Sequence, residues 1–278
     1  MGMIDPPKEY LQGPLTNVAD YLNIVLKWRQ QQEKNLKDNK FLSEVWFRGC
    51  SATDYPNPLE PGVYRENFTK RAEVHYGKDL EEKRLNLERE MLAEFRILGA
   101  ALFDANDLIE VYFNAQHYGM PTCLLDWTTN TLAGLFFAVK NRKKHGVDGE
   151  VFVMAASYTL PSVKGDLRLF SVVSMRHSRV KEGIQQSFWS ESEPEKPIII
   201  PLRPDNLPGR IMQQSSRFTL HMYNSEQCKN KTLAKIKVPS SAKGTILEEL
   251  YHLNINEFTM YNNLDRLSID MKRAWKIE

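Results

Sequence analysis

The spacing of apolar and polar positions predicts a chain in which helices and short strands alternate. Apolar residues recur at helical spacing in two segments where helices are expected, 17–32 and 80–103. Start and stop signals predict a helix near 106–118, and an apolar helix is expected from the capping residues 128–130 to about 139. Two more helices are expected near 242–253 and 264–275. Runs rich in β-branched and aromatic residues predict buried strands at 44–47, 122–127, 150–156, 198–202, 218–223 and 233–238. These elements predict an α+β fold with a mixed or antiparallel central sheet and flanking helices.

Residues that break or cap regular structure mark the boundaries of these elements. Three prolines within 51–65 predict a loop, because proline fixes φ and lacks a backbone donor. The helix near 106–118 is expected to end at Gly119, which places Gln116 and His117 on its last turn. Asp126 and the polar residues 128–130 are candidate caps for the helix that follows.

Length and composition indicate a globular chain without an internal linker. The 278 residues are 42% hydrophobic and 26% charged, as in ordinary folded domains. No Gly/Ser-rich or Pro-rich linker divides the later part of the chain. We therefore expect a helical extension over 1–40 and one domain over 41–278.

Composition also excludes several classes of protein. The longest apolar stretch, Leu132–Val139, is far below the roughly 20 residues of a membrane-spanning helix. Residues 1–14 lack the apolar segment of a signal peptide, so we expect a cytoplasmic protein. Cys50, Cys123 and Cys228 are odd in number and widely spaced, which predicts reduced thiols. A net charge of +2 is too small to indicate nucleic-acid binding by itself.

Common catalytic motifs do not occur in the sequence. It contains no GxGxxG, GxxxxGK[ST], HExxH or GxSxG. The six histidines are not at ligand spacing with cysteine or acidic partners, so no metal site is predicted.

Four dense segments carry the most unusual residue combinations: WFRG at 46–49, LEPGVYR at 59–65, AQHYGMPTCLLDWT at 115–128 and RIMQQSSRF at 210–218. Together they resemble the FRG-domain family over about residues 45–221. The sequence departs from the family pattern at Cys123, where the family often has Arg, and at Ser216, where it often has Gly.

The resemblance implies a fold and an activity. The layout of the family looks like that of ADP-ribosyltransferases, whose first strand ends in an Arg or His that holds NAD. Arg48, the segment 122–128, the apolar segment 132–139 and Gln214 follow in the order that this comparison requires. The comparison is at the level of fold, so the activity has to be argued from the site itself.

The resemblance and the chemistry of NAD cleavage together give a set of candidate site residues. The candidate catalytic residues are Arg48, His117, Asp126 and Gln214. The candidate NAD-binding residues are Arg48, Gly49, Arg65, Tyr118, Thr122, Trp127, Thr128 and Arg210. An arginine can bind pyrophosphate with two parallel bonds, aromatic rings can stack on nicotinamide, and a histidine can act as base toward the acceptor.

Structural roles compete with these assignments. Arg48 can be one half of a buried ion pair with Asp126. Asp126 can cap the next helix, His117 can bind the last carbonyl groups of its own helix, and Gln214 can bond within a strand.

The favoured function is an NAD-dependent ADP-ribosyltransferase, as the toxin of a bacterial toxin–antitoxin or phage-defence system. Its acceptor would be RNA or protein, and an antitoxin would neutralise it. A typical transferase activates the acceptor with Glu, whereas this chain has Gln213 and Gln214. The alternatives are a non-catalytic module that binds nucleotides or nucleic acid through Arg48, Arg65 and Arg210, and a metal-independent nuclease that uses His117.

Overall fold

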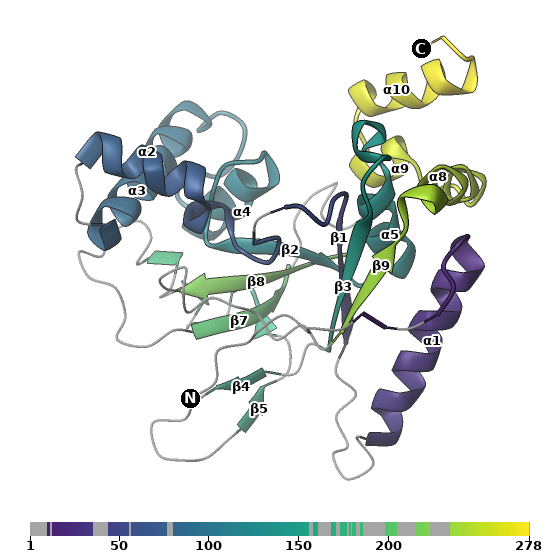
Figure 1. Ribbon diagram of the computed structural model, residues 1–278. Coiled ribbons are helices and arrows are strands. Elements are labelled where there is room, and N and C mark those ends of the chain that lie inside the picture. The colour runs from purple at the N-terminus through teal and green to yellow at the C-terminus, as the bar shows by residue number, and fades with distance from the viewer. Residues whose placement is uncertain are drawn as a thin grey trace.

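A seven-stranded sheet forms the centre of the protein in the computed structural model (Figure 1), which describes residues 10–11, 13–35, 44–55, 57–76, 80–155, 158–160, 168–170, 173–176, 178, 180–181, 184–185, 198–204, 215–222 and 234–277. The sheet contains β1 (Val45–Cys50), β2 (Leu124–Thr128), β3 (Gly149–Ala155), β6 (Val173–Ser174), β7 (Ile198–Arg203), β8 (Ser216–Met222) and β9 (Ala234–Val238). A separate hairpin pairs β4 (Tyr158–Leu160) with β5 (Arg168–Phe170).

The strand order in the large sheet is β6-β7-β8-β2-β1-β3-β9. The pairs are antiparallel except for the short parallel pair of β6 and β7. The described helices are α1 (Val18–Asn35), α2 (Glu66–Tyr76), α3 (Leu80–Leu98), α4 (Leu108–His117), α5 (Thr131–Val139), α8 (Lys243–His252), α9 (Glu257–Tyr261) and α10 (Leu264–Ala274). The predicted α+β class with a mixed sheet is therefore confirmed.

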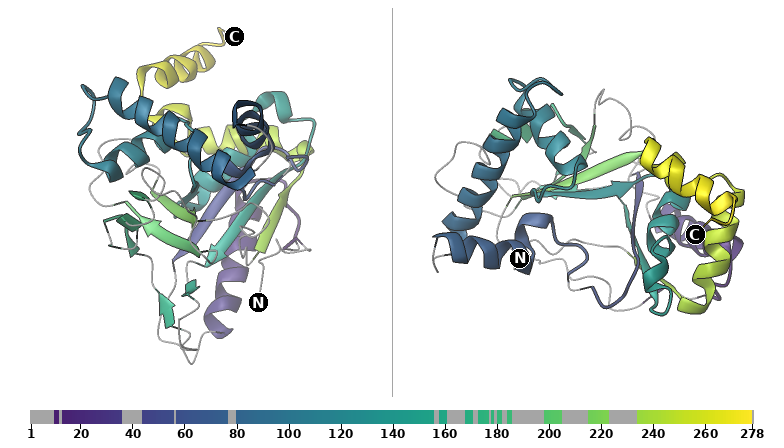
Figure 2. Two further views of the ribbon diagram at one scale, coloured as in Figure 1. Left: turned by 90° about the vertical axis from the view of Figure 1, so that its left-hand side faces the viewer. Right: turned by 90° about the horizontal axis from the view of Figure 1, so that it is seen from above.

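The sheet consists of two halves that meet at a narrow seam between β1 and β2. Strand β1 pairs with β3 at six positions and β2 pairs with β8 at five, whereas β1 and β2 pair only at Phe47 and Thr128. The strands of the two halves run in clearly different directions (Figures 1 and 2). Beyond the single pair, β1 and β2 separate, and this separation makes room for a cleft.

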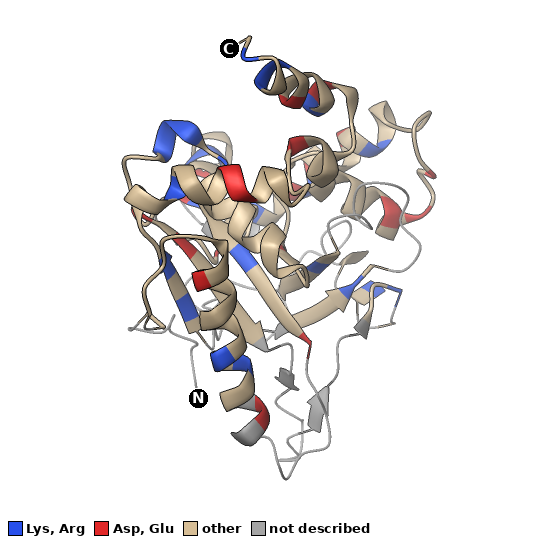
Figure 3. Ribbon diagram, turned by 90° about the vertical axis from the view of Figure 1, so that its right-hand side faces the viewer, with Lys and Arg blue, Asp and Glu red and all other residues tan. Residues whose placement is uncertain are grey.

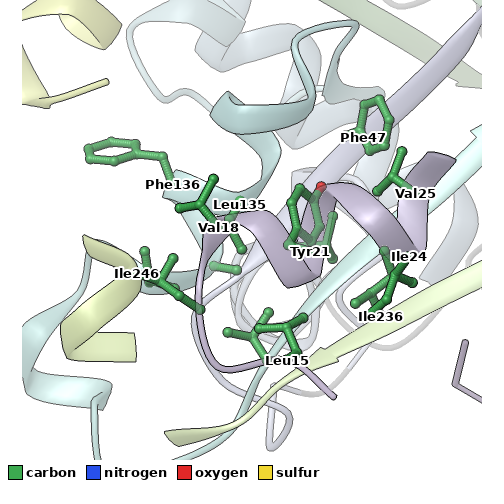
Figure 4. Close-up of a cluster of buried hydrophobic side chains, with 14 of the residues drawn as sticks. Leu15, Val18, Tyr21, Ile24, Val25, Phe47, Leu135, Phe136, Ile236 and Ile246 are labelled. Carbon is green, nitrogen blue, oxygen red and sulfur yellow. The ribbon is translucent and has the colours of Figure 1, made fainter. Parts of the chain in front are cut away.

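Each half of the sheet is covered by its own group of helices. Helices α2, α3 and α4 pack against the β2-β8-β7 half, and α1, α5 and α8 cover the β1-β3-β9 half (Figure 1). In the second group, the ring of Tyr21 from α1 is fully buried and its hydroxyl donates a 3.1 Å hydrogen bond to the carbonyl oxygen of Thr131 (Figure 4). Helix α1 therefore packs directly on the sheet half that carries β1.

Strand β1 and helix α5 approach each other so closely that both need a glycine. A Cβ atom at Gly49 would lie 2.1 Å from the carbonyl oxygen of Gly134 and 2.6 Å from the backbone nitrogen of Ala138. A Cβ atom at Gly134 would lie 2.6 Å from Cβ of Phe47. The glycine of the Trp-Phe-Arg-Gly motif is thus required by backbone packing.

The last helix, α10, is joined to the body mainly by charged side chains. Arg266 pairs with Glu257 at 3.1 Å, Arg273 pairs with Glu248 at 2.5 Å, and Asp270 accepts a 2.6 Å hydrogen bond from the backbone of Phe258. Both signs of charge are interspersed along α10 and over the body (Figure 3). Within the described part of the chain, no helix has the length and apolar character needed to cross a membrane.

Candidate functional site

Two neighbouring pockets open where β1 and β2 separate, and Arg48, Gln116 and Asp126 line both of them. The smaller pocket has a volume of about 260 Å³ and the larger about 720 Å³. Pockets that bind small ligands commonly have volumes of a few hundred Å³ or more and contain a few polar groups that converge on the ligand. Three of the four candidate catalytic residues, Arg48, His117 and Asp126, line the smaller pocket, so the structure brings them together. The candidate NAD-binding residues Gly49, Trp127 and Thr128 line it as well.

Asp126 is the one exposed residue of β2, between buried neighbours on both sides. Its side chain contacts solvent in the pockets, but burial by the surrounding protein atoms raises the pKa of its carboxyl group. The charge of Arg48 and a hydrogen bond from Gln116 act in the opposite direction and lower this pKa. The interpretation of Asp126 as a helix cap is wrong, because Asn130 caps α5 through bonds from Leu132 N and Ala133 N. The carboxylate is therefore available for chemistry in the pocket.

Gln116 holds Asp126 in place, and the sequence analysis did not assign it to the site. Its Nε2 atom donates a 2.8 Å hydrogen bond to Oδ2 of Asp126, and its Oε1 accepts a 2.5 Å hydrogen bond from Oγ1 of Thr122. Thr122 is buried and reaches the pockets only through Gln116. The sequence signal for Gln116 was its place beside His117 on the last helical turn.

Arg48 bonds to two backbone carbonyl groups. Its Nε donates to Pro58 O at 3.1 Å, and its Nη1 donates to Asp126 O at 2.9 Å. Among the described residues, no ion pair joins Arg48 to the carboxylate of Asp126, so the predicted salt bridge is replaced by a bond to the main chain. Its Nη2 atom makes no hydrogen bond among the described residues, and Arg48 lines both pockets.

His117 and the residues at the end of β2 form other parts of the smaller pocket. His117 lies at the end of α4, with its ring edge-to-face against Tyr118 at 5.1 Å between centroids. Tyr118 itself is 71% exposed and lines neither pocket. Trp127 and Thr128 line the smaller pocket, although the indole N–H of Trp127 is already bonded to Thr219 at 3.0 Å.

The larger pocket is rich in arginine. Arg65, which follows the 3₁₀ turn Gly62–Tyr64, lines it together with Arg48 and with Arg71 from α2. Burial, followed by the nearby charge of Arg48, lowers the pKa of Arg65. Arg48 and Arg65 thus place positive charge in the wall of this pocket.

A buried hydrogen-bond network fixes the segment that leads into β2. Tyr112 donates to Glu88 Oε1 at 2.8 Å and accepts a 2.9 Å bond from the backbone of Cys123. Burial raises the pKa of Glu88, whose side chain is fully enclosed. Cys123, one of the departures from the family pattern, belongs to this buried scaffold and not to either pocket.

Part of the site comes from distant parts of the chain that the sequence analysis did not assign. Ser216 at the start of β8, Phe137 of α5 and Tyr261 of α9 line the smaller pocket. Tyr261 is held by Lys140, which bonds to its hydroxyl group, and by Arg266, whose guanidinium lies 4.6 Å from its ring centroid.

Two predicted site residues, Gln214 and Arg210, lie outside the described residues. Within the part of the chain that the structure describes, no group of three or more His, Cys, Asp or Glu side chains is arranged to hold a metal ion.

Comparison with known proteins supports the family that the motifs predicted. Residues 43–146 match the family model of the FRG domain. The match contains the first three motifs and ends before the fourth, and before Ser216 and Tyr261. No curated protein and no solved structure matches the chain.

Proposed function

Starting from this FRG domain, we propose that the protein is an ADP-ribosyltransferase that uses NAD and transfers its ADP-ribose to RNA or protein. The observation that carries the proposal is the position of the Asp126 carboxylate. It lies in a pocket beside Arg48 and His117, and no ion pair with Arg48 neutralises it.

The chemistry needs a carboxylate in such a place. When the bond between nicotinamide and ribose breaks, its electron pair goes to the nicotinamide nitrogen, and positive charge develops on the ribose. A fixed negative group near the ribose stabilises that charge in a site shielded from water. Asp126 supplies this group in its ionised form, which the Arg48 charge and the Gln116 hydrogen bond favour against the effect of burial. Gln116 also keeps the carboxylate oriented through the 2.8 Å hydrogen bond.

The other residues of the smaller pocket have complementary roles. The N–H groups of Arg48 that make no bond within the fold bind the pyrophosphate of NAD. Trp127 lines the pocket, but its ring is buried in a core cluster, so it has no stacking role in this proposal. His117 accepts the proton of the attacking hydroxyl group of the acceptor, which is the role that Glu has in a typical transferase.

The architecture is consistent with this activity. The cleft opens at the end of the Arg-bearing strand β1, next to the strand–helix unit formed by β2 and α5. These are the first three elements in the order expected from the resemblance to ADP-ribosyltransferases, and the fourth, Gln214, lies outside the described residues. Because uncontrolled consumption of NAD harms a cell, such an enzyme would act as the toxin of a toxin–antitoxin or phage-defence system and would be held inactive by an antitoxin.

The test is release of nicotinamide from NAD by purified protein, with and without cellular RNA or protein as acceptor. We expect release by wild type, and a loss of at least about 100-fold in Asp126→Asn, which keeps the shape but removes the charge. Asp104→Asn, at an exposed position outside both pockets, is the matched control. Equal turnover by Asp126→Asn and wild type would refute the proposal.

A nucleotide-binding module without catalysis is the second candidate function. The arginines of the larger pocket favour it, because they bind phosphate groups whether or not NAD is cleaved. Tight binding of NAD without any release of nicotinamide would support this alternative.

A further inference from the structure

The larger pocket has features that cleavage of the nicotinamide bond does not use. Its volume of about 720 Å³ exceeds that of the smaller pocket, and Arg65 and Arg71 lie only in its wall. Both residues come from the segment 62–76, which forms one wall of the pocket.

The positive charge in this pocket is not used by the fold. Arg65 donates from Nε to the backbone oxygen of Glu60 at 3.1 Å, and the other nitrogens of its guanidinium have no bond among the described residues. Arg71 is exposed and forms no ion pair within the described part of the chain. Asp126 and Glu60 lie near enough to favour the charged form of Arg65, but neither is paired with it. Three guanidinium groups beside the one carboxylate of the lining leave an excess of positive charge, and clustered guanidinium groups are well suited to bind phosphate.

The same pocket also has apolar lining. Phe68, Leu87, Met91, Met120 and Pro121 contribute to it, and they come from α2, α3 and the loop before β2. Aromatic, methionine and proline side chains form surfaces on which a flat heterocyclic base can pack. The lining of the pocket therefore offers groups suited to phosphates and groups suited to a base.

We propose that the larger pocket binds the nucleoside diphosphate half of the substrate, with the diphosphate on Arg48, Arg65 and Arg71 and the base among the apolar side chains. This inference rests on the proposed function, because the ligand assigned to the larger pocket is the ADP half of NAD. Arg48, Gln116 and Asp126 line both pockets, which allows one NAD molecule to occupy both of them. The nicotinamide half of NAD then lies in the smaller pocket.

The experiment is a calorimetric titration of the full chain with ADP, adenosine and inorganic pyrophosphate. We expect ADP to bind at least about tenfold more tightly than adenosine or pyrophosphate, because only ADP engages both the arginines and the apolar side chains of the pocket. Arg71→Ala and Arg65→Ala should each weaken ADP about tenfold or more, the loss expected for a charge-assisted hydrogen bond. Arg29→Ala, which removes an exposed arginine on α1, is the control and should bind ADP as wild type does.

Several outcomes would overturn the inference. They are no binding of ADP, equal binding of ADP and adenosine, or unchanged ADP binding in both arginine variants while melting curves show that they are folded. Displacement of ADP by a short single-stranded RNA lacking a diphosphate would assign the pocket to nucleic acid instead. Binding of ADP that depends on Arg65 and Arg71, without any release of nicotinamide, would refute the proposed enzyme activity but leave this site in place.

Discussion

Arg48 binds the main-chain carbonyl oxygen of Asp126 at 2.9 Å and leaves the carboxylate of the same residue to Gln116. The arginine therefore joins β1 to β2 without neutralising the acidic group between the pockets. The two roles considered for Arg48, in structure and in ligand binding, involve different N–H groups of one guanidinium.

Substitution of Arg48 separates these roles. Arg48→Lys cannot reach the carbonyl groups of Pro58 and Asp126 in the same way and cannot form a two-pronged contact with phosphate. In both Arg48→Lys and Arg48→Ala, we expect the free energy of unfolding to fall by about 1–3 kcal/mol. We also expect both variants to lose most of the NAD turnover of wild type. Thermal melting and nicotinamide release measure the two effects. Folded variants with full turnover would remove Arg48 from the site.

Substitution of Gln116 should reduce NAD turnover more than it reduces stability. Gln116→Ala removes the group that orients the Asp126 carboxylate, and it leaves the hydroxyl of buried Thr122 without its acceptor. We expect a loss of about 1–2 kcal/mol in stability and a loss of at least tenfold in turnover. Asn114→Ala on the same helix, at a position that lines neither pocket, is the control. The prediction fails if both variants have the turnover of wild type.

Gly49 is predicted to be essential for folding. Gly49→Ala places a methyl group 2.1 Å from the Gly134 carbonyl oxygen, so β1 and α5 must move apart. We expect a loss of at least about 3 kcal/mol, or insoluble protein. Gly244→Ala in α8 is the matched control, because its Cβ meets no atom within 4 Å. It should gain about 0.5–1 kcal/mol from higher helix propensity. Equal denaturant midpoints for the two variants would contradict the packing argument.

Stability should fall in acid because of His221. Its side chain is fully buried, and burial, with a smaller contribution from the charge of Arg48, lowers its pKa from 6.5 to about 3. Between these values the unfolded chain binds a proton that the folded chain does not bind, so stability is lost as pH falls through this window. The slope for one such group is at most about 1.4 kcal/mol per pH unit.

Urea unfolding of wild type and His221→Gln at several pH values measures this effect. The variant should have a flatter pH dependence below pH 6.5, the ordinary pKa of histidine. His75→Gln at an exposed position should follow wild type. Parallel curves for His221→Gln and wild type would exclude His221 as the source.

The regular elements were predicted from the sequence where local signals agree. The apolar stripes and caps of α4 and α5 and the β-branched runs of β3 and β9 gave these elements to within a few residues. Helix α2 was missed, because only Phe68 and Ala72 of its eleven residues are buried and they form no recognisable stripe. Helix propensity and the spacing of apolar residues indicate a helix clearly only when many of its side chains are buried along one face. A helix that packs with few side chains therefore leaves little signal in the sequence.

The site was predicted only in part, for a related reason. Arg48, His117 and Asp126 could be found because unusual residue combinations surround them. The bond from Gln116 to Asp126 depends on how the end of α4 faces β2, and Tyr261 enters the smaller pocket from the far end of the chain. No spacing rule along the sequence encodes either contact.

The narrow seam between β1 and β2 places the pockets at the junction of the two halves of the sheet. The Phe47–Thr128 pair, the bond from Arg48 to Asp126 and the ion pair of Glu44 with Arg217 join the halves there. A buried cluster, with Trp46 of β1 and Trp127 of β2, also spans the junction. A ligand that contacts both Arg48 and Asp126 therefore adds a further connection between two halves that share few backbone hydrogen bonds.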